Sequence, residues 1–183
     1  MSRPWRLIVD QAASGPWNMS VDEALLTSLQ QGLGVTTLRF YRWLPATVSL
    51  GYFQNAADVD LAAIDRLRLG LVRRPTGGRA ILHDDELTYS LVVPAAALPG
   101  GRSVGRSYLA ISSGLLAGLE LLGVGARVGQ SRTTRSAISP GCFALSTRAD
   151  LTAAGRKIIG SAQTRRRGFI LQHGSIPLTL DVR

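Results

Sequence analysis

One thiol and one amine are the side chains of this sequence with the most distinctive chemistry. Lys157 is the only lysine among 21 basic residues, and Cys142, the only cysteine, lies fifteen residues before it. An ammonium group can lose its proton when it is desolvated, whereas a guanidinium group effectively cannot. A chain that otherwise uses arginine therefore has a chemical reason to keep a lysine here. A thiol and a titratable amine are the minimum equipment for acyl transfer through a thioester.

Each of these two residues also has an ordinary structural interpretation. Buried, inert cysteines are common, and a lone lysine is usually a solvated surface charge. Cys142 follows a polar stretch and lies in Ser-Pro-Gly-Cys-Phe, a setting with nearby arginines that favours an exposed thiol with a lowered pKa. A turn expected at Ala154-Gly155 could fold Lys157 back towards Cys142. From the residues alone, both interpretations stay open.

The segment 73–79, Arg-Arg-Pro-Thr-Gly-Gly-Arg, is a second candidate site. Its proline and two adjacent glycines keep it out of regular structure. Adjacent glycines let backbone amides approach a ligand closely, and the arginines could hold an anion. The segment is not a Walker A loop, because no Gly-Lys-Ser/Thr follows it. An ordinary surface turn is the alternative.

Two histidines invite a metal or catalytic interpretation, and the sequence gives little support for either. His83 begins His-Asp-Asp-Glu, but adjacent residues of a strand point to opposite faces, so the four side chains cannot all bind one ion. His173, in Gln-His-Gly-Ser, has no helix-spaced partner. We therefore expect hydrogen-bonded structural histidines and no metal site. Neither a Ser-His-Asp order nor a glycine-flanked serine elbow is evident.

The elements that position these residues alternate between strand and helix early in the chain and are strands later. Hydrophobic patterning predicts strands over 5–9, 38–43, 46–50, 80–82, 87–93, 149–153, 157–163 and 169–180, and helices over 18–31, 58–69 and 103–122. Asn18 or Ser20 is expected to cap the first helix, and Leu61 and Leu67 of the second to face inward. This order of elements predicts an α/β (α+β) fold with a mixed β-sheet.

Composition bounds the class of protein. At 183 residues, with 45% hydrophobic and 18% charged residues, the chain fits one globular domain over residues 1–183. A single cysteine excludes an internal disulfide, and no apolar run suits a signal peptide or a membrane span, so we expect a cytoplasmic protein that binds no membrane. A net charge of +9 attracts acidic proteins or nucleic acid. The aromatic content is only 6% and does not interleave with the arginines, which disfavours nucleic acid.

Five segments together resemble a known superfamily. Residues 73–84, Arg-Arg-Pro-Thr-Gly-Gly-Arg-Ala-Ile-Leu-His-Asp, are similar to the signature of lipoate-protein ligases and biotin-protein ligases. Residues 17–24, 39–43, 51–55 and 160–175 resemble the lipoate branch of that superfamily. Gly-Gly-Arg at 77–79, Cys-Phe at 142–143 and Gly-Arg-Lys at 155–157 are together most similar to the LipM-type octanoyltransferases.

The resemblance implies a fold and an activity. The implied fold is a mixed β-sheet flanked by helices, the catalytic-domain fold of biotin- and lipoate-protein ligases, which is like that of class II aminoacyl-tRNA synthetases. The implied activity moves an octanoyl group from octanoyl-acyl carrier protein, through a cysteine thioester, to a lysine of a lipoyl-domain protein such as the glycine-cleavage H protein or a dehydrogenase E2 domain. These carriers are typically acidic, which suits the positive chain. No cofactor, ATP or metal is implied.

The resemblance also gives roles to residues. It implies Cys142 and Lys157 as the catalytic pair. The substrate-binding residues that it implies are Arg74, Thr76, Gly77, Gly78, Arg79, His83, Gly160, Ser161, Ala162, Gln163 and His173. Backbone amides near Gly77 and Gly78 would help to hold the acyl carbonyl oxygen or its oxyanion.

Three other functions are compatible with parts of this pattern. ATP-dependent lipoate-protein ligases usually carry a third glycine where this chain has Arg79, and they lack a cysteine matching Cys142. An amidotransferase that moves octanoyl between lipoyl domains also uses a cysteine, and the sequence does not separate it. A non-catalytic member would bind carriers or nucleic acid. Members of the family usually continue beyond the segment matching 175–181, so the resemblance implies a catalytic domain without the family's C-terminal extension.

Overall fold

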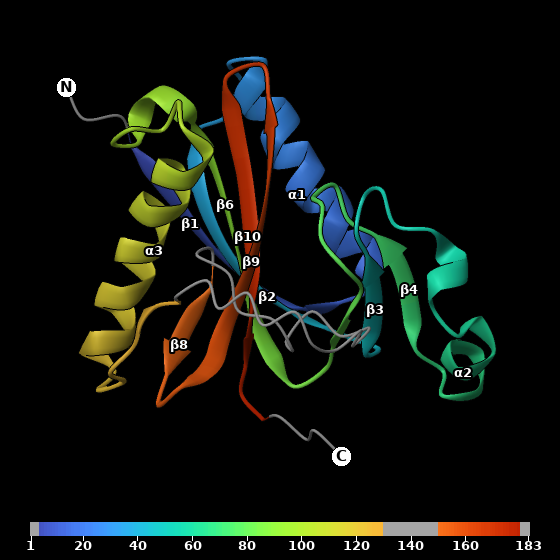
Figure 1. The fold of residues 1–183 in the computed structure, drawn as a ribbon. Coiled ribbons are helices and arrows are strands. Elements are labelled where there is room, and N and C mark those ends of the chain that lie inside the picture. The colour runs from blue at the N-terminus through green and yellow to red at the C-terminus, as the bar shows by residue number, and fades with distance from the viewer. Residues whose placement is uncertain (1–3, 130–149, 180–183) are drawn as a thin grey trace.

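The computed structural model describes residues 4–129 and 150–179, so Cys142 lies outside the described residues (Figure 1). In chain order the elements are β1 (Trp5–Ala13), α1 (Gly15–Gln30), β2 (Thr36–Trp43), β3 (Thr47–Leu50), η1 (Ala56–Asp58), α2 (Leu61–Arg66), β4 (Gly70–Arg73), β5 (Ile81–His83), β6 (Glu86–Pro94), η2 (Ala95–Ala97), α3 (Val104–Leu121), β7 (Arg127–Val128), β8 (Leu151–Ala153), β9 (Arg156–Arg166) and β10 (Phe169–Pro177). No helix in this part of the chain is long and apolar enough to cross a membrane.

The strands of the described residues form two sheets. The larger has the order β1-β2-β6-β10-β9-β8-β7, and the smaller has the order β4-β3-β5. In the larger sheet β1 and β2 are parallel and the other neighbours are antiparallel. In the smaller sheet β3 is parallel to β4 and antiparallel to β5. The expectation of a mixed sheet is confirmed.

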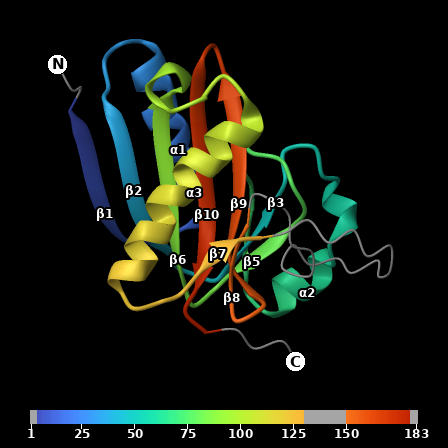
Figure 2. The same cartoon turned by 60° about the vertical axis from the view of Figure 1, so that its left-hand side comes forward.

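Helices cover both faces of the larger sheet. Figures 1 and 2 show α3 on one face, with α1 on the other face beside the smaller sheet. Because side chains alternate along a strand, Ile170 of β10 joins the core under α3, while Leu171 packs with Leu26 and Leu29 of α1. The same alternation turns His173 towards α1. Residues of one strand therefore serve two different layers.

The first helix begins earlier than the sequence suggested. Ser14 is its N-cap and accepts a hydrogen bond from the Trp17 amide, and Pro16 lies in the first turn. The Asn18 side chain is instead fully buried and donates to the carbonyl oxygens of Ala13 and Arg42. The expectation that Asn18 or Ser20 caps the helix was wrong, and the Ser-Gly-Pro run is the signal that locates the true start.

The second helix also differs from expectation. Its N-cap is Asp60, as one of the two candidates, but it spans only Leu61–Arg66 and none of its residues is buried. Leu61 is 48% exposed and Leu67 is 62% exposed, so the prediction that they face inward was wrong. Val59 and Ile64, which were also expected to face inward, are half-buried. The helix lies at the margin of the smaller sheet and does not lie over a core (Figure 1). The long helix α3 and the closing strands β8, β9 and β10 agree with the prediction.

Candidate functional site

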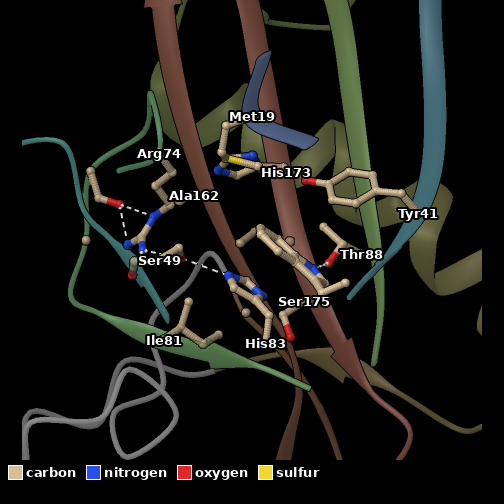
Figure 3. A pocket seen from close by; sticks show the side chains of 16 residues that line it. Met19, Tyr41, Ser49, Arg74, Ile81, His83, Thr88, Ala162, His173 and Ser175 are labelled. Carbon is tan, nitrogen blue, oxygen red and sulfur yellow. Dashed lines mark hydrogen bonds between the residues drawn. The ribbon is translucent and has the colours of Figure 1, made fainter. Parts of the chain in front are cut away.

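A pocket lies between the two sheets and contains most of the residues that the sequence singled out (Figure 3). Its walls come from α1, β2, β3, β5, β6, β9, β10 and the loop after β4. The predicted residues among those that line it are Arg74, Gly77, Gly78, His83, Gly160, Ser161, Ala162 and His173. Segments separated by nearly a hundred residues therefore meet at one cavity.

Arg74 shapes the loop of residues 74–80 between β4 and β5, called the glycine loop below, from its inner side. Its side chain is buried, and its guanidinium group donates to the carbonyl oxygens of Gly77 (2.8 Å from Nη2), Arg79 (2.8 Å) and Ser49 (2.9 Å). It also donates to the Ser49 hydroxyl at 3.0 Å. The loop is thus wrapped around a positive charge of its own. Arg74 therefore acts on the loop backbone and also lines the pocket, and the anion-holding role that the sequence suggested for these arginines stays a prediction.

Two glycines let this loop lie against β3. A Cβ atom at Gly51 would fall 1.8 Å from the carbonyl oxygen of Gly78, so only glycine fits there. Gly78 itself has a φ of 99°, which side chains disfavour. Because a trans peptide places its C=O and N–H on opposite sides, the carbonyl of Gly77 that points at Arg74 turns the Gly78 N–H away from it. Gly78 lines the pocket.

His83 links the pocket to a buried carboxylate. Its Nδ1 lies 2.8 Å from Oε1 of Glu86, and its Nε2 lies 2.8 Å from the Ser49 hydroxyl. Burial lowers the pKa of His83, and this outweighs the contact with Glu86, which acts in the opposite direction. A neutral ring then donates through Nδ1 and accepts from Ser49 through Nε2. Ser49 is also bonded to Arg74, so the chain Glu86–His83–Ser49–Arg74 is continuous.

Glu86 is the centre of this network. It accepts hydrogen bonds from the hydroxyl groups of Thr88 and Ser175 as well as from His83. Burial acts to raise the pKa of Glu86, but the hydrogen bonds and the His83 contact outweigh it and hold that pKa below its usual value. The Trp43 indole N–H donates to Thr88 at 2.7 Å. These polar groups therefore satisfy one another.

His173 makes a second, parallel link. Its Nδ1 lies 3.2 Å from Oδ2 of Asp22, and its Nε2 lies 2.6 Å from the hydroxyl of Thr76, which is fully buried in the glycine loop. Asp22 also accepts from Ser90 and from Arg39, a fully buried cation. The expectation of hydrogen-bonded histidines is confirmed at both positions. Each histidine joins a buried carboxylate to a group that holds the loop.

Aromatic rings complete the pocket wall. Trp43 stacks on His83 with ring centroids 4.0 Å apart and planes 11° from parallel. The Tyr41 hydroxyl donates to Asp22 at 3.1 Å, and burial, reinforced by that carboxylate, raises the Tyr41 pKa well above its usual value. Because the polar atoms of the wall are paired with one another, its inner surface offers mainly carbon to a ligand. The pocket is therefore suited to an apolar ligand.

Lys157 is a buried amine in an ion pair. It lies in β9, three residues before Gly160, and its Nζ is 3.0 Å from Oδ1 of Asp150. Their side chains are only 6% and 3% exposed, which excludes a solvated surface lysine. The N–H of Gly129 donates to the main-chain oxygen of Asp150 at 2.8 Å. The two described residues that border the segment containing Cys142 are therefore joined beside Lys157.

Three of the predicted substrate-binding residues do not line the pocket, and neither does Lys157. Thr76 lies behind the wall and bonds to His173, and Arg79 is exposed. Gln163 points to the α3 side, where it donates to Gln172 at 2.9 Å and accepts from Ser107 at 3.2 Å. Thr76 and Gln163 support neighbouring elements through these contacts. Cys142, in the segment outside the described residues, is not placed.

The pocket also contains residues that sequence reasoning did not assign to it. They are Met19, Tyr41, Trp43, Ser49, Ile81, Thr88, Gly174 and Ser175. Met19, Tyr41 and Trp43 lie within the segments 17–24 and 39–43 that carried the resemblance, and Gly174 and Ser175 follow His173 directly. Ile81 lies within the segment 73–84, so the signal for these six was present. Ser49, Thr88 and Glu86 carry no motif and become visible only through their hydrogen bonds.

A second cavity, of about 730 Å³, lies on the opposite face of the larger sheet under α3. Its lining is almost wholly aliphatic and aromatic, with contributions from β2, β6, α3 and β10. None of the residues in the predicted site lines it. Across the described residues, no three His, Cys, Asp or Glu side chains are grouped to hold a metal ion.

Comparison with known proteins identifies the family of this chain. A model of the lipoyl protein ligase A/B catalytic domain matches residues 14–183. The chain belongs to this family. Among its relatives, octanoyltransferase LipM of Symbiobacterium thermophilum is 49% identical over 188 residues, which cover 100% of this chain and 68% of the relative. LipM of Carboxydothermus hydrogenoformans is 46% identical, over 97% of this chain and 66% of the relative. The chain thus spans about two thirds of the length of these relatives.

A solved structure of the same kind supports the fold. The putative lipoate protein ligase from T. acidophilum, with bound lipoic acid, superposes with a TM-score of 0.77 at 29% identity, covering 97% of this chain and 69% of that one. The fold expected from the sequence, a mixed sheet flanked by helices like that of lipoate-protein ligases, is confirmed. The pocket between the sheets is therefore the candidate active site of a lipoyl protein ligase A/B family member.

Proposed function

We propose that this protein is an octanoyltransferase of lipoate biosynthesis. It takes an octanoyl group from acyl carrier protein as a Cys142 thioester and passes it to a lysine of a lipoyl-domain protein. The observation that carries the proposal is the 49% identity to octanoyltransferase LipM over the whole chain. The pocket and the buried Lys157 support it, because each supplies a part that the reaction needs.

The pocket between the sheets binds the octanoyl chain. Its wall includes Met19, Trp43, Ile81 and Ala162, and its polar atoms are engaged with one another. Burying an alkyl chain contributes about 0.8 kcal/mol per CH₂, so an octanoyl tail gains roughly 5 kcal/mol before ordering costs. That gain is enough to hold the acyl group while its carrier changes.

The glycine loop holds the carbonyl end. Attack on a thioester places negative charge on the carbonyl oxygen, and preorganised N–H donors stabilise that charge. The Gly78 N–H is turned away from Arg74 at the pocket wall, and the buried guanidinium lies behind it. Arg74 thus stabilises the loop shape and adds positive potential at the pocket that it lines.

Cys142 and Lys157 carry the two transfer steps. The Cys142 thiolate attacks the carrier thioester, a C–S bond to the enzyme forms, and the carrier leaves as a thiol with a proton from the Lys157 ammonium. The acceptor lysine amine then attacks the Cys142 thioester, the amide forms, and the sulfur departs as thiolate while Lys157 takes the proton released by the amine. The acid and the base are thus the same group at successive steps.

The chain can bring these two groups together. Seven residues separate Cys142 from Asp150, and the eight steps of chain between them can reach up to about 28 Å when extended. Asp150 is in contact with Lys157. Cys142 therefore belongs to a segment whose two flanking residues, Gly129 and Asp150, are hydrogen-bonded to each other, and Asp150 contacts the amine that we assign to the same reaction.

Intact mass spectrometry tests this function. Mixing the protein with octanoyl-acyl carrier protein is expected to add one octanoyl group to Cys142, and hydroxylamine should remove it because thioesters are labile to that reagent. Cys142→Ser should show no hydroxylamine-labile adduct and no transfer to a lipoyl domain. Full transfer by Cys142→Ala would remove Cys142 from the mechanism.

An ATP-dependent lipoate ligase is the second candidate, favoured by the structural similarity to the T. acidophilum ligase. The identity to that protein is lower, at 29%, than the 49% to LipM. A reaction with free octanoate, ATP and acceptor separates the two functions. Amide formation with release of pyrophosphate would identify a ligase, whereas transfer only from the acyl carrier identifies the transferase.

A further inference from the structure

Asp150 is the charged partner of the only lysine in the chain. The Nζ of Lys157 and Oδ1 of Asp150 are 3.0 Å apart, within side chains that are 6% and 3% exposed. A charge so poorly solvated must be matched by an opposite charge in good geometry, and loss of a contacting partner is strongly destabilising. The orientation of the amine therefore depends on Asp150.

The strand geometry is arranged to make this contact. Along β8 and β9, Leu151 pairs with Ile159 but the next residue, Thr152, pairs with Lys157, so β9 carries one extra residue between the two pairs. A β-bulge of this kind re-aims the side chains of the bulged strand. Without it, the alternation of β9 would be shifted by one residue relative to β8, and Lys157 would point differently.

Asp150 lies close to the candidate active site. Its charge acts on the phenol groups of Tyr89 in β6 and Tyr108 in α3; burial is the main reason that both have raised pKa values, with Tyr89 at about 12, and Asp150 adds to it. The Tyr89 hydroxyl is in turn 2.8 Å from the hydroxyl of Ser161, which lines the pocket. Leu151, next to Asp150 in the chain, packs in the same core cluster as Tyr89, so the ion pair lies near the pocket wall.

We propose that Asp150 is a positioning residue, whose carboxylate fixes the Lys157 amine for acyl transfer. The inference rests on the proposed function, since it needs Lys157 to act in that reaction. The main chain of Asp150 adds a second role, because its carbonyl oxygen accepts from the Gly129 N–H at 2.8 Å. One residue thereby contacts the amine with its side chain and holds Gly129 with its backbone.

The single lysine makes a direct test possible, because an amine-selective acetylating reagent can label only Lys157 and the α-amino group. Asp150→Asn keeps the size of the side chain and removes its charge. We expect the rate of Lys157 acetylation at pH 8, followed by peptide mass spectrometry, to rise at least about tenfold, because the amine loses the carboxylate that contacts it and turns more readily towards solvent. Asp84→Asn, which removes an exposed carboxylate, is the matched control and should leave the rate unchanged.

The same variant should slow catalysis in a characteristic way. A misplaced catalytic group costs up to about 100-fold, so kcat should fall by about that factor while KM for the octanoyl carrier changes less than about threefold. Asp150→Glu keeps the charge but moves it by one methylene. It should retain slow acetylation and lose part of kcat, and it replaces Asp150→Asn if that variant does not fold.

Each result bears on one proposal or the other. Equal acetylation rates in Asp150→Asn and Asp84→Asn would show that Asp150 does not hold the amine, whatever the activity. Rapid acetylation with kcat unchanged would also overturn the positioning role. Rapid acetylation of Asp150→Asn together with full activity of Lys157→Gln would leave the ion pair intact as a finding and refute the use of Lys157 in the proposed reaction.

Discussion

Replacing Gly51 by alanine should displace the glycine loop, although the substitution itself removes no hydrogen-bonding group. An added Cβ would lie 1.8 Å from the carbonyl oxygen of Gly78 and 2.8 Å from its carbonyl carbon. Cβ contacts shorter than 3.0 Å essentially do not occur, so the two segments must separate by at least 1.2 Å (3.0 − 1.8). Both obstructing atoms belong to the backbone, and no side-chain rotation can relieve the contact.

The magnitude follows from that displacement. Inserting a methyl group into a closely packed site costs about 1–3 kcal/mol of unfolding free energy. A shift of about 1 Å in a group that positions substrate can cost about 100-fold in rate. For Gly51→Ala we therefore expect a loss of that order in kcat/KM for octanoyl transfer, with a fold that remains intact under native conditions.

Urea unfolding and a transfer assay to a lipoyl domain measure the two effects. Gly105→Ala is the control, because Gly105 is exposed in α3 and a Cβ there meets no atom within 4 Å. Alanine in a helix is favoured over glycine by about 0.5–1 kcal/mol, so this variant should be slightly more stable and equally active. If Gly51→Ala matches Gly105→Ala in transfer rate, the loop does not position the acyl group as argued.

Further variants test the pocket, the histidine links and the effect of acid. Ala162→Leu should shorten the longest acyl chain accepted in a transfer assay, while Gly118→Leu, which extends into the cavity under α3, should not; the reverse result would move the acyl site to that cavity. Thr76→Val removes the hydroxyl bonded to His173 and should cost about 1–3 kcal/mol in urea unfolding, with Thr76→Ser restoring most of it; equal stability of both would contradict the link. Since His83 and Glu86 have folded-state pKa values below their reference values of 6.5 and 4.5, the unfolded chain binds more protons in acid, so stability present at pH 7 should decline as pH falls below 6.5 and again below 4.5. Unfolding free energies that stay constant from pH 7 to pH 5 would show that His83 is not buried as a neutral ring.

The order of elements and the residues of the pocket were largely readable from the sequence. Apolar alternation located β9 and β10, and the glycine loop could be found because proline and paired glycines interrupt any periodic pattern. The start of α1 was misplaced since several residues near it, among them Asn18, are good caps, and only the fold decides that Asn18 is used to tie β1 to β2. Local sequence signals identify several possible helix caps, and tertiary contacts determine which of them is used.

The role of Arg74 and the partners of Lys157 could not have been read in the same way. A guanidinium next to glycines suggests an anion site, and only the fold shows that this one donates to two loop carbonyls, those of Gly77 and Arg79, and to Ser49 of β3. Asp150 carries no motif, and its contact with Lys157 depends on a bulge that no hydrophobic pattern reveals. Such pairings are set by strand register, which a single sequence specifies only weakly.

The carbonyl oxygens of the glycine loop are organised by a cation that is part of the chain itself. In many proteins a cluster of carbonyl oxygens is organised by a bound metal ion, whose departure lets the loop relax. Here the organising cation is the Arg74 side chain, which is covalently attached and remains charged at any physiological pH. Chelators and competing ions have nothing to remove, so the shape of the loop should be the same in a freshly made chain, in a dialysed sample and in the crowded interior of a cell.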